Sequence, residues 1–181
     1  MKMKSRPVCI AEYGSDYLVK KKVEEGKLYR VGKALYSESR YVPELAVIAY
    51  KYPKAVVTME TAFYIHGLTD LIPDIYDFAT DRDGAKIRSS RVRQYFVPSL
   101  LFDKGSESVD YNGYTIRIYS RERMLVELLR YKNKLPYDYY KGVLREYRKI
   151  IDKLDLEALD ECIQCAPRCN RIREMLQAEV L

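Results

Sequence analysis

Three cysteines near the C-terminus have a spacing that could bind a metal. Cys162, Cys165 and Cys169 form Cys-x2-Cys-x3-Cys, with Cys9 as a conceivable fourth ligand, and thiolates at such spacing bind zinc or an iron–sulfur cluster. Alternatively, positions i, i+3 and i+7 place three small apolar side chains on one buried helical face. We predict packing, without metal or cofactor. Pro167 would interrupt that helix, which leaves the metal alternative open.

His66 is the only histidine of the 181-residue chain. A single imidazole excludes most acid–base and metal constellations, so we expect His66, near a helix end, to make a structural polar contact and not to act as a base. The motifs Gly-x-x-x-x-Gly-Lys, Gly-x-Gly-x-x-Gly and Gly-x-Ser-x-Gly are missing from the sequence. We therefore predict no catalytic residue and no enzyme, but a protein that binds other macromolecules.

An acidic stretch invites comparison with metal-dependent nucleases. Its carboxylates are Asp70, Asp74, Asp77, Asp81 and Asp83. Pro73-Asp74 with a later carboxylate and lysine is similar to the restriction-endonuclease signature. That signature places acid and lysine on alternate residues of one strand, whereas Asp83 and Lys86 are three residues apart. We interpret these carboxylates as loop-capping or solvated.

Positive charge is concentrated near the N-terminus. Nine basic and four acidic residues lie between Met1 and Ser37, a surplus of five in a chain of net charge +6. A localised basic patch of this kind is typical of a polyanion-binding surface, most often one for nucleic acid. The alternative is a solvated terminus, and charge alone does not decide between the two.

The elements that would position this charge can be predicted from local patterns. Ser15 is a good N-cap for a helix over Asp16–Glu25, and Gly26 can end that helix. Leu28–Val31 and Ala34–Ser37 are predicted as two short strands around a tight turn. A helix followed by a hairpin is the second half of a winged helix.

The rest of the chain predicts strands and then helices. A buried helix is expected over Glu44–Tyr50 and another between a Thr58 cap and Gly67, whereas Ala55–Val57 is too short to classify. The predicted strands are Ile75–Thr80, Val92–Val97 and a hairpin over Asp110–Tyr119 with a type I′ turn at Asn112-Gly113. Ser120 is expected to cap the first of four helices, over Arg121–Lys132, Tyr137–Leu154, Leu156–Cys165 and Asn170–Ala178.

These elements indicate an α+β fold. We predict a small N-terminal winged-helix-like unit over residues 1–38, then a mixed α/β domain over residues 39–181 that is helical from about residue 121 onward. An apolar fraction of 48% and a charged fraction of 32% are typical of globular chains and exclude a disordered one.

Composition also bears on location. No run approaches the ~18 apolar residues of a membrane span, and Met-Lys-Met-Lys-Ser-Arg-Pro lacks the apolar core of a signal peptide. We expect a cytoplasmic protein that does not bind membranes. Four cysteines are too few for a disulfide scaffold in a chain of this length.

Eighteen tyrosines without a tryptophan are an unusual composition. Several lie in the C-terminal helices: Tyr131, Tyr137, Tyr139, Tyr140 and Tyr147. We expect most of them to serve packing. Mixed with nearby arginines and lysines, they could also contact RNA, because aromatic rings stack on unpaired bases.

Three segments resemble the AbiEi antitoxin family of type IV bacterial abortive-infection systems. Val23–Tyr36 is similar to the family's helix-to-wing segment, and Tyr119–Leu129 to its strand-to-helix junction. Thr61–Asp70 with Ile72-Pro73 is the most specific match. Together the matches extend from about Ser15 to Lys132.

The resemblance implies an N-terminal winged helix-turn-helix that represses the protein's own promoter. It also implies a C-terminal domain that counteracts a co-encoded nucleotidyltransferase toxin without a stable complex. An RNA-binding antitoxin that acts on the toxin's RNA substrate is the alternative. By residue, the resemblance assigns Ser15, Tyr17, Lys20, Lys21 and Lys22 to the DNA-recognition helix, and Lys27, Arg30 and Lys33 to phosphate contacts on the wing.

The sequence departs from the family pattern at its start. Only fourteen residues precede Ser15, and they include Pro7 and Gly14, which leaves little room for the helix that supports a recognition helix. An incomplete winged helix is therefore one prediction, and it puts specific operator binding in doubt. Phosphate contact depends on charge more than on orientation, so it would survive.

Overall fold

A computed structural model describes residues 2–180 and shows a mixed α+β fold, as predicted. The chain forms two compact units. The first contains the chain up to Pro53 together with Val109–Ile116, and the second contains Lys54–Ser108 together with the chain from Arg117 onward. No helix in the described part is long and apolar enough to cross a membrane.

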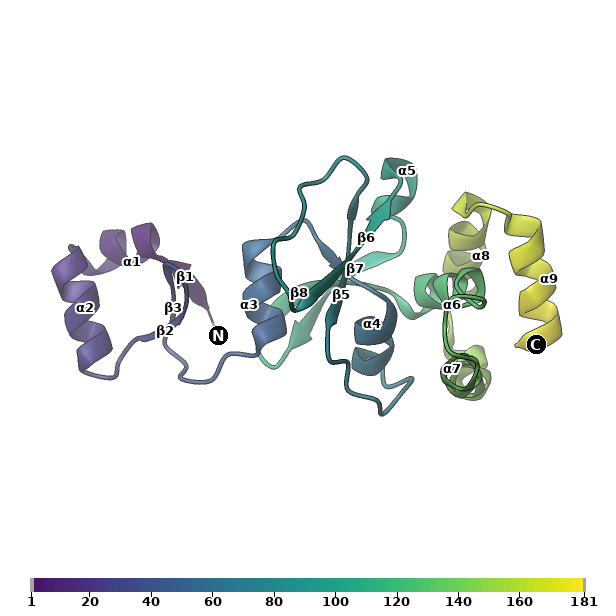
Figure 1. The fold of residues 1–181 in the computed structure, drawn as a ribbon, viewed down its shortest axis with the longest axis horizontal. Helices are drawn as coiled ribbons and strands as arrows, with labels where there is room; N and C mark the ends of the chain where they lie inside the picture. The colour runs from purple at the N-terminus through teal and green to yellow at the C-terminus, as the bar shows by residue number, and fades with distance from the viewer. Residues whose placement is uncertain (1, 181) are drawn as a thin grey trace. The chain divides into compact units, whose positions relative to one another are not determined.

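The first unit combines a helix pair with a small sheet (Figure 1). Its elements are β1 (Met3–Ser5), α1 (Arg6–Tyr13), α2 (Asp16–Glu24), β2 (Tyr29–Gly32), β3 (Leu35–Ser37) and α3 (Glu44–Lys51). The sheet has the order β1-β3-β2, and both pairings are antiparallel. A helix pair followed by a β-hairpin is thus present within the predicted residues 1–38.

The expectation that α2 lacks a supporting helix is wrong, because α1 lies directly before it. Pro7 lies in the first turn of α1, where its missing N–H removes no helical hydrogen bond. Gly14 ends the helix with a left-handed φ of 92°, and its N–H donates to the Ile10 carbonyl oxygen at 2.8 Å. The two residues that suggested a broken segment are therefore the ends of an eight-residue helix.

Three side chains form the centre of the first unit. Cys9 of α1 and Val19 of α2 have no exposed surface, and Leu28, just before β2, is 1% exposed. Partly buried Tyr13 and Val23 pack around them. This core fixes α2 against α1 and the sheet, so the opposite face of α2 is left for solvent.

The second unit is a mixed sheet with helices. It contains β4 (Val56–Val57), α4 (Met59–Ile65), β5 (Tyr76–Asp81), β6 (Val92–Val97), α5 (Ser99–Phe102), α6 (Arg121–Arg130), α7 (Tyr137–Ile150), the 3-10 turn η1 (Ile151–Lys153), α8 (Leu156–Cys165) and α9 (Cys169–Glu179). With β7 (Ser106–Tyr111) and β8 (Tyr114–Tyr119) the sheet order is β6-β5-β4-β8-β7.

Local patterns predicted the β7–β8 turn and the start of α6 correctly. Asn112 and Gly113 both have positive φ, 52° and 81°, as a type I′ turn requires. Ser120 caps α6 by accepting a hydrogen bond from the Arg123 N–H at 3.3 Å. The predicted single helix over Tyr137–Leu154 is shorter, because the chain tightens into η1 after Ile150.

The segment that the sequence left unclassified lies in the middle of the larger sheet. Val56 and Val57 form β4 and are fully buried. β4 pairs antiparallel with β5 and parallel with β8, where Val57 lies opposite Ile118. Two central residues suffice for this strand because it has neighbours on both sides.

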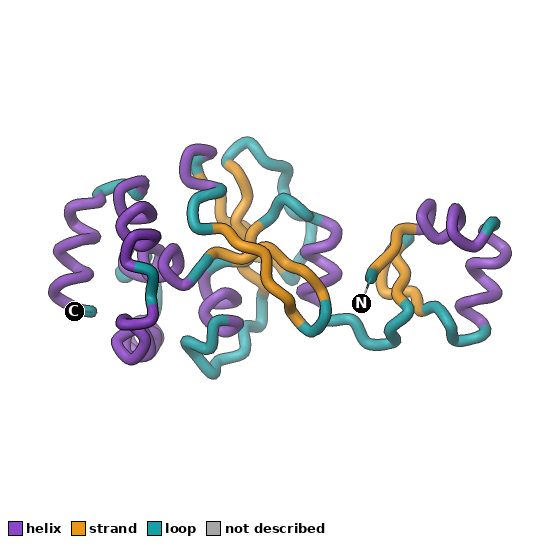
Figure 2. The backbone as a smooth tube through the Cα atoms, turned by 180° about the vertical axis from the view of Figure 1, so that it is seen from behind, coloured by secondary structure: helices purple, strands orange, loops and turns teal. Residues whose placement is uncertain are grey.

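α6 is the central helix of the second unit. Arg123–Leu129 are all buried, and α6 packs against α4, α7, α8 and α9. Figure 2 shows these C-terminal helices as one cluster beside the strands. α6 therefore determines where the neighbouring helices place their exposed side chains.

Candidate nucleic-acid interface

Ser15 has a structural role at the start of α2. Its Oγ accepts a hydrogen bond from the Leu18 N–H at 3.2 Å, with extended backbone at Ser15, as in an N-cap. The predicted contact of Ser15 with DNA would therefore have to coexist with this cap. The cap fixes where α2 begins and which of its faces points outward.

The outward face of α2 contains Tyr17, Lys20, Lys21 and Glu24, all exposed. Their spacing of three and four residues places them on one side of the helix. The Tyr17 side chain is 72% exposed, although it is aromatic. An exposed tyrosine one turn before lysines can contact both the sugar–phosphate backbone and base edges.

The β2–β3 hairpin presents a second group of cations. Arg30 is exposed on β2, and its Nε donates to the Gly32 carbonyl oxygen at 3.4 Å. Lys33 is exposed in the tight turn, where Ala34 has a positive φ of 55°. Lys27 lies just before β2 and forms an ion pair with Glu25 at 2.9 Å. Arg30 and Lys33 therefore occupy the positions that the resemblance assigns to the wing.

Acidic side chains neutralise part of the predicted basic patch. Lys4 forms ion pairs with both Glu12 and Glu38, each at 2.8 Å, and these hydrogen bonds raise the pKa of Lys4 well above its usual value. Arg6 and Lys20 share one carboxylate, Asp16, at 2.8 and 3.3 Å.

The hydrogen bond from Arg6 is the main cause that lowers the pKa of Asp16. Lys20 and Asp16 are four residues apart, whereas the other pairs join residues eight to 34 positions apart along the chain. Their existence makes the available positive charge smaller than the sequence suggested.

Of the six cations among the predicted site residues, four have no carboxylate at ion-pair distance within residues 2–180: Lys21, Lys22, Arg30 and Lys33. We call them the unpaired basic set. Lys22 is half-buried, and its Nζ lies 5.8 Å from the centre of the Tyr13 ring, within cation–π range. The other three are exposed. Of the eight predicted site residues, these four have charge available for phosphates.

The cysteine cluster does not form the buried helical face that we expected. Cys162 and Cys165 lie on α8, whereas Cys169 begins α9, because Ala166–Arg168 separate the two helices. Cys162 is buried and Cys165 is exposed. Among the described residues, no group of three or more His, Cys, Asp or Glu side chains is arranged to hold a metal ion.

Asp77 is not the solvated or loop-capping carboxylate that we expected. It is fully buried in β5, and it accepts hydrogen bonds from Arg93 Nε at 2.7 Å and Nη2 at 3.1 Å. Its Oδ2 also accepts from the Glu60 N–H at 2.9 Å, so Asp77 caps α4 in place of Thr58, whose side chain makes no cap bond. Burial raises the pKa of Asp77, and the Arg93 hydrogen bonds oppose that shift.

The C-terminal tyrosines are mostly packing residues. Tyr140 and Tyr147 of α7 are 1% and 0% exposed. Their hydroxyl groups donate to Glu179 Oε2 and to the Arg121 carbonyl oxygen, each at 2.9 Å. Neither ring can stack on an RNA base in this structure. Tyr137, 69% exposed, keeps that possibility.

Comparison with known proteins shows a shared fold and no family. No protein-family model matches the chain, and no curated protein matches it in sequence. Among solved structures, the fold is similar to that of the RV2827C protein from Mycobacterium tuberculosis, with a TM-score of 0.61 and 13% sequence identity. The alignment covers 99% of this chain and 72% of the mycobacterial one.

Proposed function

We propose that this protein binds DNA through α2 and the β2–β3 hairpin and regulates transcription from its own promoter. The unpaired basic set supports the proposal. Its members lie on the second helix of a helix pair and on the hairpin that follows. In winged helix-turn-helix proteins these two elements contact the major groove and the flanking phosphates.

The surroundings of α2 support insertion into a groove. Val19 and Val23 face the core, so the helix is held by α1, and Tyr17 and Lys21 point away from it. An α-helix fits the width of the major groove of B-DNA. The hairpin would then contact phosphates through Arg30 and Lys33, which fix the position of the helix without reading sequence.

The resemblance to the AbiEi family extends the proposal to a cytoplasmic antitoxin. In that role the second unit counteracts a co-encoded nucleotidyltransferase toxin without a stable complex. Co-expression with the neighbouring gene tests this part: growth rescue by the wild-type chain supports it, and unrelieved toxicity contradicts it.

A gel-shift titration on the DNA upstream of the gene tests the DNA-binding part. We expect Lys21→Ala/Lys22→Ala to weaken binding on the order of tenfold to a hundredfold, because two charge-assisted phosphate contacts are lost. The matched control is Lys86→Ala/Lys153→Ala, which removes the same charge from exposed positions of the second unit. We expect the control to bind like the wild type.

Competition distinguishes the possible nucleic acids. Upstream DNA should displace the labelled probe at a lower concentration than unrelated DNA or transfer RNA. Preferential displacement by transfer RNA would favour the RNA-binding alternative. If the Lys21/Lys22 variant and its control lost DNA affinity equally, binding would depend on net charge alone, and the proposal would be overturned.

A further inference from the structure

A cavity in the second unit lies where the end of α6 and the following turn meet the start of α9. Its volume is about 550 Å³, and its walls come from residues 129–133 and 167–175. Leu129 and Ile172, 2% and 3% exposed, are buried residues of its lining. A volume of this size is in the range of small-molecule sites.

Positive charge dominates the cavity wall. Four cations line it, namely Arg130, Lys132, Arg168 and Arg171, and Glu174 is the acidic residue among the lining side chains. Arg168 and Arg171 are exposed and have no carboxylate at ion-pair distance in the part of the chain that the structure describes. The cavity therefore has a charge surplus that its own walls do not neutralise.

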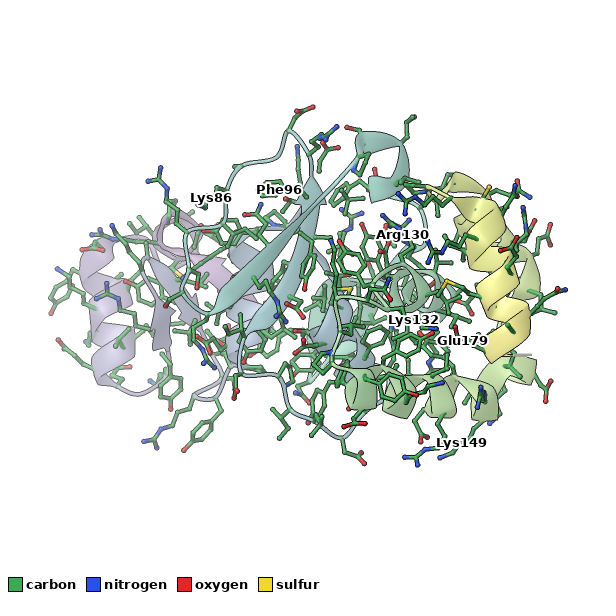
Figure 3. All side chains as sticks on the ribbon, turned by 45° about the vertical axis from the view of Figure 1, so that its right-hand side comes forward. Lys86, Phe96, Arg130, Lys132, Lys149 and Glu179 are labelled. Carbon is green, nitrogen blue, oxygen red and sulfur yellow. The ribbon has the colours of Figure 1, made fainter. Side chains whose placement is uncertain are left out.

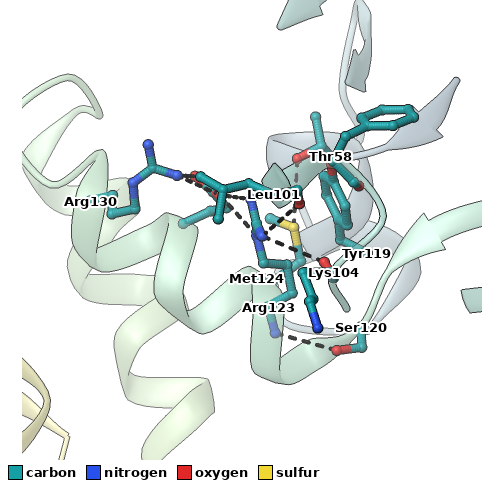
Figure 4. Close-up of polar contacts among 10 residues, drawn as sticks. Thr58, Leu101, Lys104, Tyr119, Ser120, Arg123, Met124 and Arg130 are labelled. Atoms are coloured by element: carbon teal, nitrogen blue, oxygen red, sulfur yellow. Dashed lines mark hydrogen bonds and ion pairs between the residues drawn. The ribbon is translucent and has the colours of Figure 1, made fainter. Parts of the chain in front are cut away.

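The other two cations are held in place by neighbouring carboxylates. Arg130 Nη1 donates to both oxygens of Glu127 at 2.7 and 2.9 Å, and Glu127 is in turn paired with the buried Arg123 (Figure 4). Lys132 pairs with Glu179, and Figure 3 labels both of these residues as well as Arg130. These pairs fix the positions of the cations and leave other donors on each for a ligand.

Arg168 has a strained backbone in addition to its unneutralised charge. Its φ is 60°, a left-handed conformation that a residue with a Cβ rarely adopts. It lies at the N-terminal end of the 11-residue helix α9, where the first turn contains no acidic residue. Positive side chains at the positive end of a helix dipole repel it, so an anion in this cavity would relieve the repulsion.

We propose that this cavity binds the phosphates of a nucleotide, with a nucleoside triphosphate as the ligand class. Arg168 and Arg171 would contact the phosphates, because guanidinium groups pair with phosphate oxygens in bidentate geometry. Lys132 would contribute a third positive charge. The apolar Met175 and the Asn133 amide, both in the cavity wall, offer a surface and a hydrogen-bonding group for the base.

Titration calorimetry with ATP, and separately with inorganic pyrophosphate, tests the site. The informative variant is Arg168→Gly/Arg171→Ala, because glycine keeps the left-handed backbone while both guanidinium groups are lost. We expect its affinity for ATP to fall about a hundredfold, roughly tenfold for each charged contact. The control Lys141→Ala/Arg145→Ala removes two exposed cations from α7, outside the cavity wall. It should change the affinity by less than about twofold.

Three outcomes would overturn the proposal. The first is no heat from the wild type with ATP or pyrophosphate at millimolar concentration, and the second is an equal loss of affinity in the two double variants. The third is an oligouridylate that binds on the order of a hundredfold more tightly than ATP through the same arginines, because the phosphates would then belong to RNA.

The variant Lys21→Ala/Lys22→Ala should bind ATP like the wild type. The experiments can therefore contradict the proposed nucleotide site and the proposed DNA interface independently of each other. Circular dichroism of each variant verifies that its fold is intact.

Discussion

His66 is held against a backbone carbonyl at the end of α4. Its Nε2 lies 2.7 Å from the Tyr119 carbonyl oxygen. Burial is the main cause that lowers the pKa of His66 from its ordinary 6.5, the Tyr119 hydrogen bond opposes the shift, and the charge of Arg121 adds to it. The expected role as a structural contact agrees with this geometry.

This shift predicts a pH dependence of stability. Because the folded pKa lies below the unfolded one, the stabilisation is complete above about pH 6.5 and is lost as the pH falls through the folded pKa. Urea unfolding between about pH 7.5 and 5 should show a decline that His66→Gln removes. The NMR titration of this single imidazole should have its midpoint below 6.5. A midpoint above 6.5 would contradict the prediction.

Gly105 allows a close approach of the chain to α6. Its φ is +68°, and a Cβ there would lie 2.6 Å from Arg123 Cβ and 3.1 Å from Cys162 Sγ. We expect Gly105→Ala to lower the free energy of unfolding by about 2 kcal/mol or more, through strain and overpacking. Gly142→Ala is the matched control, because a Cβ at this position of α7 meets no atom within 4 Å. It should stabilise by about 0.5–1 kcal/mol in the same urea titration.

At the level of single residues, the sequence predicts what is local. The cap at Ser120 and the turn at Asn112 depend on neighbours within a few positions, and both predictions are confirmed. The ion pair of Lys4 with Glu38 spans 34 positions, so no local pattern indicates it. The size of the basic patch was overestimated for this reason.

At the level of elements, α1 shows how breaker residues can be misjudged. Pro7 and Gly14 interrupt a helix only in its interior, and here they lie in its first turn and just after its last residue. β4 shows a different limit, because two valines have no periodicity and their strand is defined by partners at Ala79 and Ile118. α1 depends on where Pro7 and Gly14 lie along the helix, and β4 depends on which strands it pairs with. Amino-acid composition gives neither kind of information.

Substitutions at Ser15, the N-cap of α2, should have different effects on protein stability and on DNA affinity. Ser15→Ala removes the bond to the Leu18 N–H and should cost about 1 kcal/mol of stability, with little effect on DNA affinity once the protein is folded. Ser15→Asp keeps a good cap, so stability should stay within about 0.5 kcal/mol of the wild type. Its negative charge beside the proposed DNA surface should weaken binding. Thermal melts and gel shifts of the two variants measure this, and equal DNA affinities would count against α2 as the recognition helix.

At the level of the whole molecule, the unpaired basic set predicts a salt dependence. Four phosphate contacts correspond to a slope of about −4 in a plot of log affinity against log salt concentration. Lys21→Ala/Lys22→Ala should reduce the magnitude of this slope by about 2, and Lys86→Ala/Lys153→Ala should leave it unchanged. Fluorescence anisotropy at several salt concentrations measures the slopes. A slope near zero would contradict the prediction that these four cations contact phosphates.

The α+β class could be predicted from the whole sequence, whereas the cavity could not. Its walls come from two segments, residues 129–133 and 167–175, that meet only after α6, α8 and α9 have packed. The charge of Arg168 and Arg171 is visible in the sequence, but its lack of carboxylate partners is a property of the packed helices. The division predicted at residue 38 stays a prediction, since the compact units are not continuous in sequence.

Each compact unit contains one buried cysteine thiol. Cys9 is 0% exposed among the side chains of the first unit, and Cys162 is 4% exposed in the second, whereas Cys165 is exposed and Cys169 partly so. In a chain with Cys165→Ser and Cys169→Ser, an alkylating reagent could modify the remaining two sulfurs only when the surrounding structure opens. Mass spectrometry of the two alkylated peptides over time would then record how often either unit opens, without any attached dye or isotope.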